Sequence, residues 1–138
     1  MYRKILVAYD GSDGARAALR SAIALAGASG GSVHLLESTG HLEHAEEGVV
    51  EADPGAESSA RHALEAAADQ LDEVPAVTRV VKGDPVAAII GTAEDIDADL
   101  IVMGSRGRAL MPKAVLGRVT SAVVSNSPCD VLVVHPEP

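Results

Sequence analysis

The stretch from residue 83 to residue 107 reads GDPVAAIIGTAEDIDADLIVMGSRG and contains one helix, one strand and the loop that follows them. Asp84 is a favourable N-cap residue and Pro85 suits the first helical position, so the helix is expected to begin there. Four apolar residues then recur on one side of that helix: Val86, Ile89, Ile90 and Ala93. Residues 98–104, ADLIVMG, form a short and almost continuous apolar run, which predicts a strand buried on both faces.

The rest of the chain repeats this alternation of strand and helix. Further strands are expected at residues 5–8, 32–38, 76–82 and 130–136, and further helices at 15–26, 57–73 and 117–127. Continuous Val, Ile and Leu runs separated by helices predict an α/β fold, a mostly parallel sheet with helices on both faces. The length of 138 residues predicts one domain, 1–138. Within it, the acidic segment 40–57, with its Gly and Pro, is expected to be a mobile loop.

The composition argues against several classes of partner. The formal net charge is −9 and the pI is near 4.8, so nucleic acids and anionic membranes would be repelled. A solvated acidic surface is the simplest explanation of this charge, and adaptation to high salt is the alternative. No apolar run of about 18 residues and no signal segment is found, so no membrane span is expected. The single cysteine fits a reducing, cytoplasmic setting.

Two loops that follow predicted strands have the chemistry of a ligand site. AYDGSDG, residues 8–14, follows the first strand, and MGSRG, residues 103–107, follows the fourth. Ligands of open α/β sheets bind beyond the carboxyl ends of the strands, so the two loops face one crevice if their strands are neighbours. Asp10 would then offer oxygens to a ribose or an amino group, while Gly104 and Gly107 would let main-chain N–H groups approach a phosphate.

Gly117 calls for a separate explanation, because glycine inside a helix costs about 1 kcal/mol relative to alanine. We therefore place Gly117 at the start of the last helix, where free N–H groups form an anion site at the positive end of the helix dipole. The alternative is that these glycines serve only as turn and cap residues. Neither G-x-G-x-x-G nor G-x-x-x-x-G-K-[ST] occurs in the chain, so the two commonest phosphate loops are absent.

The segment GSRGRALMPKAVLGR, residues 104–118, resembles the G-2x-G-9x-G-[ST] nucleotide motif of the universal stress protein family. ILVAYDGS resembles that family's opening strand and loop, residues 83–107 its third helix and fourth strand, and SPCDVLVVHP its closing strand. The resemblance implies a Rossmann-like fold, of the flavodoxin-like or adenine nucleotide alpha hydrolase-like type. It also implies five parallel strands in the order 3-2-1-4-5, a homodimer and, in one branch of the family, bound ATP.

Carried over by position, the family's nucleotide site falls on three parts of this chain. Ala8, Tyr9 and Asp10 would lie beside the adenosine, and Ser38 near the adenine. The residues around the ribose and the phosphates would be Met103, Gly104, Arg106, Gly107, Arg108, Gly117, Arg118, Val119 and Thr120. Arg106, Arg108, Lys113 and Arg118 gather cations in an otherwise acidic chain, which favours an anionic ligand.

The chain departs from the family pattern at the proposed site. Arg118 stands where the motif has Ser or Thr, so a long cation replaces a short hydroxyl that would bond phosphate or assist a metal. Its guanidinium either pairs with phosphate and strengthens binding, or fills the site and mimics a cation already in place. The three retained glycines and the cluster of cations favour binding. Ser38 stands where the family usually has an aliphatic residue, and Glu37 before it adds a negative charge near the pocket.

Other candidate chemistry has weaker support in the sequence. His41 and His44 would chelate a metal only if the acidic segment around them became helical, so a solvated loop is the simpler interpretation. No G-x-S-x-G elbow occurs and no Ser, His and Asp set can be assembled from spacing, which argues against a nucleophilic hydrolase. Cys129 is interpreted as a small buried hydrophobe, and a redox sensor would instead need an exposed thiolate.

These observations lead to one principal expectation and two alternatives. The principal one is a cytoplasmic universal stress protein that binds ATP or a related adenine nucleotide, with or without Mg²⁺, as a sensor or regulatory module. A homodimer is expected to form along residues 130–134, because an apolar edge strand invites pairing with a second copy. The alternatives are a slow ATPase and a family member that acts only through protein contacts.

Overall fold

The computed structural model describes residues 1–39, 43–45, 48–50, 56–71, 73–106 and 116–136. In chain order the elements are β1 (Lys4–Ala8), α1 (Asp13–Ser29), β2 (Ser32–Thr39), β3 (Glu43–Ala45), β4 (Gly48–Val50), α2 (Ala56–Ala68), a 3₁₀ turn (Asp69–Leu71), β5 (Ala76–Lys82), α3 (Pro85–Ile96), β6 (Leu100–Gly104), α4 (Arg118–Asn126) and β7 (Asp130–Val134).

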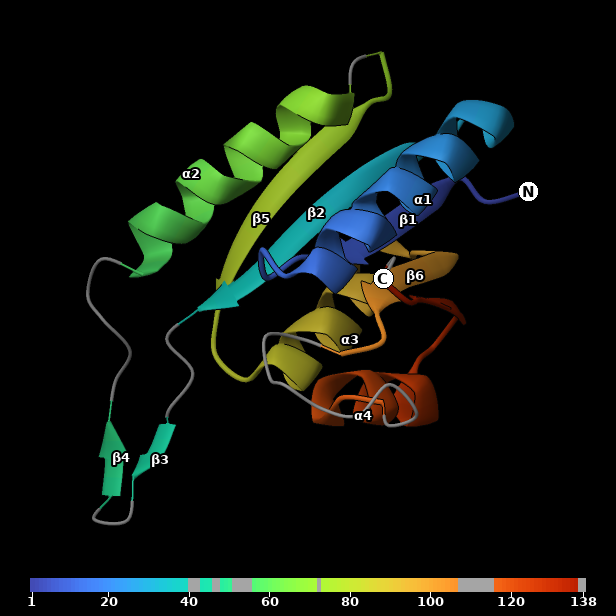
Figure 1. The fold of residues 1–138 in the computed structure, drawn as a ribbon. Coiled ribbons are helices and arrows are strands. Elements are labelled where there is room, and N and C mark those ends of the chain that lie inside the picture. Colours follow the sequence, from blue (N-terminus) through green and yellow to red (C-terminus); the bar gives the residue numbers. More distant parts are fainter. Residues whose placement is uncertain (40–42, 46–47, 51–55, 72, 107–115, 137–138) are drawn as a thin grey trace.

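Five strands pair in parallel in the order β5-β2-β1-β6-β7 (Figure 1). Numbered along the chain, the strands of this sheet have the order 3-2-1-4-5, which confirms the predicted α/β fold. Parallel neighbours need a crossover connection, and the helices between successive strands supply it. The two edge strands are β5 and β7.

The helices cover both faces of the sheet and explain why its central strands are apolar throughout. α1 and α2 lie over one face, and α3 and α4 over the other (Figure 1). In β1, Ile5 and Val7 pack toward α1 while Leu6 packs toward α3. All three side chains are fully buried, so neither face of this strand has a place for a polar residue.

Helix ends follow the capping residues expected from the sequence. Asp84 is the N-cap of α3, its carboxylate accepts the Ala87 N–H at 3.0 Å, and Pro85 is the first helical residue. Gly117 is the N-cap of α4 rather than an interior residue. At the C-terminus of α1, the C-cap residue Gly30 adopts φ +71°, a left-handed conformation that glycine takes without the Cβ penalty.

Two elements differ from the sequence-based expectation. The segment 40–57, expected to be a mobile loop, contains the antiparallel pair β3 and β4, and α2 begins within it at Ala56. Each of these strands has only three residues, too few to show a recognisable alternation. The helix expected over 57–73 ends at Ala68 and continues as a 3₁₀ turn, because the last turn of a helix often tightens in this way.

Candidate functional site

The winding of the sheet reverses between β1 and β6. From β1 the chain passes through α1 to β2 on one side, whereas β6 pairs with β1 on the other. Ile5, Leu6 and Val7 are in register with Leu100, Ile101 and Val102. The loops after β1 and after β6 therefore leave the same edge of the sheet side by side, which is where α/β sheets bind ligands.

A pocket of about 430 Å³ opens at this edge. Its volume lies in the range of small-molecule and cofactor sites. The lining residues come from the ends of β1, β2 and β6, the loops after β1 and β6, and the first turns of α3 and α4: Ala8, Tyr9, Asp10, Ser12, Leu36, Glu37, Ser38, Pro85, Ile89, Met103, Gly104, Arg106, Gly117, Arg118, Val119 and Thr120.

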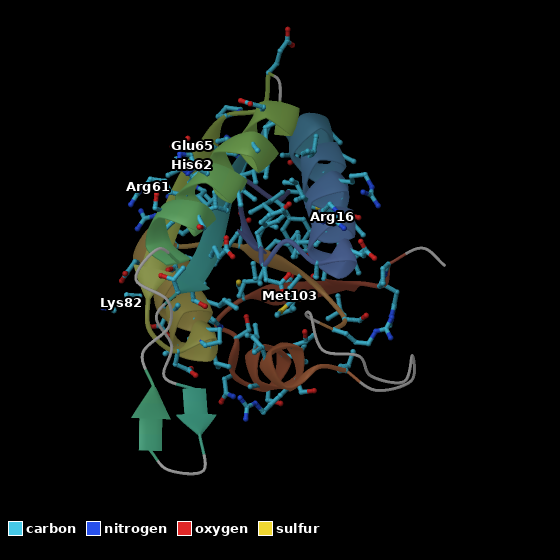
Figure 2. The ribbon with its side chains drawn as sticks, turned by 60° about the vertical axis from the view of Figure 1, so that its left-hand side comes forward. Arg16, Arg61, His62, Glu65, Lys82 and Met103 are labelled. Carbon is cyan, nitrogen blue, oxygen red and sulfur yellow. The ribbon has the colours of Figure 1, made fainter. Side chains whose placement is uncertain are left out.

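One wall of the pocket is apolar. Leu36, Ile89 and Met103 belong to the core cluster between the sheet and the α3/α4 layer, and Val119 packs against the same cluster. Met103 lies at the carboxyl end of β6, on the side where α4 packs (Figure 2). A flat organic ring fits against such a wall without a stacking aromatic, because aliphatic and thioether groups supply the contact.

The loop after β1 is held in shape by its own polar groups. Asp10 Oδ1 accepts the Ser12 N–H at 2.9 Å, and Ser12 Oγ accepts the Ala15 N–H at 3.1 Å as the N-cap of α1. Tyr9 N–H donates to the Leu36 carbonyl at 2.8 Å, which continues the β1–β2 pairing by one residue. The position of the Asp10 carboxylate at the pocket is thus fixed by the turn that starts α1.

The start of α4 is the part of the pocket best suited to an anion. The N-terminus of α1 is capped by Ser12 and that of α3 by Asp84, whereas the Gly117 N-cap of α4 has no side chain to engage the first amides. Gly117 N–H itself donates to the Ser105 carbonyl at 2.7 Å, which orients this turn relative to β6. Arg118, the first residue of α4, is exposed, and Arg106 lines the same pocket.

Gly104 has a structural reason to be glycine apart from any ligand. A Cβ at Gly104 would lie 2.8 Å from the carbonyl carbon of Gly14 and 2.9 Å from its Cα. A Cβ on Gly14 would in turn lie 3.2 Å from the Arg106 carbonyl oxygen. Thr120 Oγ1 donates to the Gly104 carbonyl at 2.8 Å, so the end of β6 is held between α1 and α4.

The site residues carried over from the resemblance lie together wherever the structure describes them. Ala8, Tyr9, Asp10, Ser38, Met103, Gly104, Arg106, Gly117, Arg118, Val119 and Thr120 all line the pocket. Gly107 and Arg108 lie outside the described residues. Sequence reasoning did not select Ser12, Leu36, Pro85 or Ile89, although Pro85 and Ile89 were already predicted at the start and on the apolar side of α3.

The other candidates lie elsewhere or outside the described part. Cys129 is half-buried against the α3/α4 core cluster, and burial raises the pKa of its thiol, which fits a small hydrophobe better than a reactive thiolate. His41 and the side chain of His44 are outside the described residues. Among those described, no group of three or more His, Cys, Asp or Glu side chains could hold a metal ion.

Comparison with known proteins places the chain in a family. The model of the universal stress protein family matches residues 1–135. The chain belongs to the universal stress protein family. The "universal stress protein in QAH/OAS sulfhydrylase 3′ region" of Thermus aquaticus is 37% identical in an alignment that covers 98% of this chain and 100% of the relative.

Solved structures of universal stress proteins share the fold. UspA from Lactobacillus plantarum is 26% identical, with a TM-score of 0.77 over 96% of this chain and 97% of that one. A universal stress protein crystallised in complex with cAMP is 27% identical, with a TM-score of 0.76 over 99% of this chain and 98% of that one. That relative therefore binds an adenine nucleotide. In the described part of the present chain, no helix is long and apolar enough to cross a membrane.

Proposed function

We propose that this universal stress protein binds ATP or a related adenine nucleotide in the pocket between β1 and β6 and acts as a regulatory or sensing module in the cytoplasm. The main support for the proposal is that a single pocket has an apolar wall on one side and the start of α4 on the other. The N-cap of α4, Gly117, makes no side-chain hydrogen bond, and the guanidinium of Arg118 follows it. The relative that is complexed with cAMP supports the choice of an adenine nucleotide.

The apolar end of the pocket is where we place the base. Leu36, Ile89 and Met103 offer a wall for the adenine ring, and Ser38 at the end of β2 adds a hydroxyl that both donates and accepts hydrogen bonds. Asp10, fixed by its turn, is within the same pocket and suits the hydroxyls of a ribose as a hydrogen-bond acceptor. We therefore expect the nucleoside to lie across the ends of β1 and β2.

The phosphates belong at the other end, in front of α4. The first amides of a helix have no intrahelical partners and the helix dipole adds partial positive charge, so a phosphate is stabilised there. Arg118 and Arg106 supply full positive charges at the same place. This donor set fits a phosphate chain, which needs main-chain N–H groups and guanidinia rather than carboxylates.

We also propose a homodimer formed along β7. This strand is an edge of the sheet, and its Leu132 side chain is 38% exposed although large and apolar. Antiparallel pairing of residues 131–134 with the same residues of a second copy would satisfy the open edge by two-fold symmetry.

Calorimetric titration with ATP tests the proposed site. We expect wild type to bind ATP and the Ala8→Phe variant to bind at least about tenfold more weakly, because the ring would fill the space beside β1. Ala24→Phe makes the same change on the exposed side of α1 and should leave the affinity unchanged. Circular dichroism checks that both variants are folded. Absence of both ATP and AMP binding by folded wild type, or equal ATP affinity in wild type and Ala8→Phe, would contradict the proposal.

A further inference from the structure

The phosphate end of the pocket differs from a site built around a divalent cation. Mg²⁺ prefers octahedral coordination by oxygen atoms of carboxylates, phosphates and water. Among the described residues, the carboxylates that line the pocket are those of Asp10 and Glu37, and Asp10 already accepts the Ser12 N–H through Oδ1. At the start of α4, where the motif that the chain resembles has a short hydroxyl, the chain has Arg118.

On the basis of the proposed nucleotide function, we propose that Arg118 takes the place of the divalent cation, so that this protein binds ATP in its metal-free form in preference to Mg²⁺–ATP. Arg118 is the first residue of α4, lines the pocket and is exposed, so its long side chain has room to reach a phosphate chain. A guanidinium donates two parallel hydrogen bonds to neighbouring phosphate oxygens and remains charged at every relevant pH.

The charges around the pocket favour metal-free ATP over Mg²⁺–ATP. Metal-free ATP carries more negative charge than its magnesium complex, and that charge meets two guanidinia and the positive end of α4. When Mg²⁺ is already bound to the terminal phosphates, it competes with Arg118 for the same oxygens and repels the guanidinium. Raising the Mg²⁺ concentration should therefore weaken ATP binding instead of strengthening it.

The serine variant at residue 118 should reverse this dependence. In Arg118→Ser the positive charge is lost, while the hydroxyl of the family motif is restored. Metal-free ATP should then bind about ten to one hundredfold more weakly, the effect expected for one charged hydrogen bond. Mg²⁺ should recover most of this loss in Arg118→Ser, but less of it in Arg118→Ala, which has no hydroxyl to assist the metal.

The experiment is a calorimetric titration of ATP and of AMP into each protein, with EDTA and with excess Mg²⁺. Arg20→Ser is the matched control, because it removes an exposed arginine from α1 that does not line the pocket. The control should follow wild type in both buffers. AMP, which ends before the terminal phosphates, should bind almost equally to wild type and to the Arg118 variants, which also shows that the pocket remains intact.

Three results would overturn the inference while leaving the nucleotide site in place. They are tighter ATP binding by wild type with Mg²⁺ than with EDTA, equal ATP affinity in wild type and Arg118→Ser under both conditions, and tighter ATP binding with EDTA after Arg118 is replaced. The last would mean that the guanidinium occupies the phosphate position itself. If wild type binds neither ATP nor AMP in either buffer, the proposed function fails and this inference fails with it.

Discussion

His34 shows how one side chain can give this protein a pH dependence that the pocket does not explain. It lies in β2, and its Nδ1 atom is buried without a hydrogen-bond partner among the described residues. Burial lowers its pKa below the ordinary value of 6.5, and the positive charges of Arg79 and Lys4 lower it further. The folded protein therefore holds this imidazole in its neutral form more strongly than the unfolded chain does.

The sign of the effect on stability follows from that difference. Well above pH 6.5 the imidazole is neutral in both states, so it contributes no pH dependence there. As the pH falls through 6.5 the unfolded chain takes up a proton that the folded protein resists, so the free energy of unfolding decreases until the pH has fallen through the folded pKa. We expect His34→Gln to lose less stability than wild type between pH 7.5 and pH 5.5. Thermal unfolding at both pH values measures this, with His62→Gln on the exposed face of α2 as the control (Figure 2). Equal losses in wild type and His34→Gln would contradict the assignment.

At the scale of single residues, the sequence suggested roles in ligand binding but not the structural contacts that the same residues make. Gly104 ends β6 and was interpreted as a phosphate-loop residue, yet its backbone lies against Gly14 of α1, a contact between segments 90 residues apart that no local pattern encodes. Thr120 was expected beside the phosphates, and its hydroxyl also donates to the Gly104 carbonyl. Such contacts become visible only once the helices and the sheet are placed.

At the scale of elements, the contact between α1 and the end of β6 fixes the shape of the pocket edge. A Cβ at Gly104 would press on the Gly14 backbone, which cannot rotate away as a side chain can. We expect Gly104→Ala to lower the free energy of unfolding by roughly 1 to 3 kcal/mol, the usual cost of overpacking.

Gly91→Ala is the matched control for that prediction. Gly91 lies inside α3, and a Cβ there meets nothing within 4 Å. The same substitution should raise the free energy of unfolding by up to about 1 kcal/mol, because alanine favours the helix. Denaturant unfolding of both variants measures the two effects. If Gly104→Ala were as stable as Gly91→Ala, the result would contradict the close approach of α1 and β6 at Gly14 and Gly104.

The elements themselves were predictable to different degrees. α3 was predicted from its cap, its proline and its apolar spacing, all of which are local, and its start at Pro85 agrees with the structure. The place of Ile89 at the pocket wall was not predictable, because it depends on how α3 crosses the sheet. The short strands β3 and β4 were missed because three residues carry too little periodic signal.

At the scale of the whole molecule, the open edge at β7 predicts association through one side of the sheet. We expect wild type to be a dimer at micromolar concentration and Leu132→Asp to be a monomer, because the substitution places two carboxylates close together across a two-fold axis. Val77→Asp makes an equal change on the opposite edge strand, β5, where the side chain is 45% exposed, and should remain dimeric. Multi-angle light scattering distinguishes these states. A monomeric wild type would contradict the proposal, and so would a Leu132→Asp variant that remains dimeric.

The sheet order illustrates what the sequence alone leaves open. Alternating strands and helices predict a parallel sheet, but the order of strands in space came from the resemblance to universal stress proteins, not from composition. The order β5-β2-β1-β6-β7 is what makes the loops after β1 and β6 neighbours, and without it Asp10 and Gly104 could not be assigned to one pocket.

The proposed adenine-nucleotide site between β1 and β6 is tested most directly by following the backbone amide signals of the protein by NMR during a titration with ATP. At 14.1 kDa the chain suits this measurement. We expect saturable shifts at Tyr9, Ser38, Met103 and residues 117–120, which line the pocket, and none on the outer face of α2, where Arg61, His62 and Glu65 lie (Figure 2). Unchanged signals for the pocket residues at millimolar ATP, or shifts confined to α2, would contradict it.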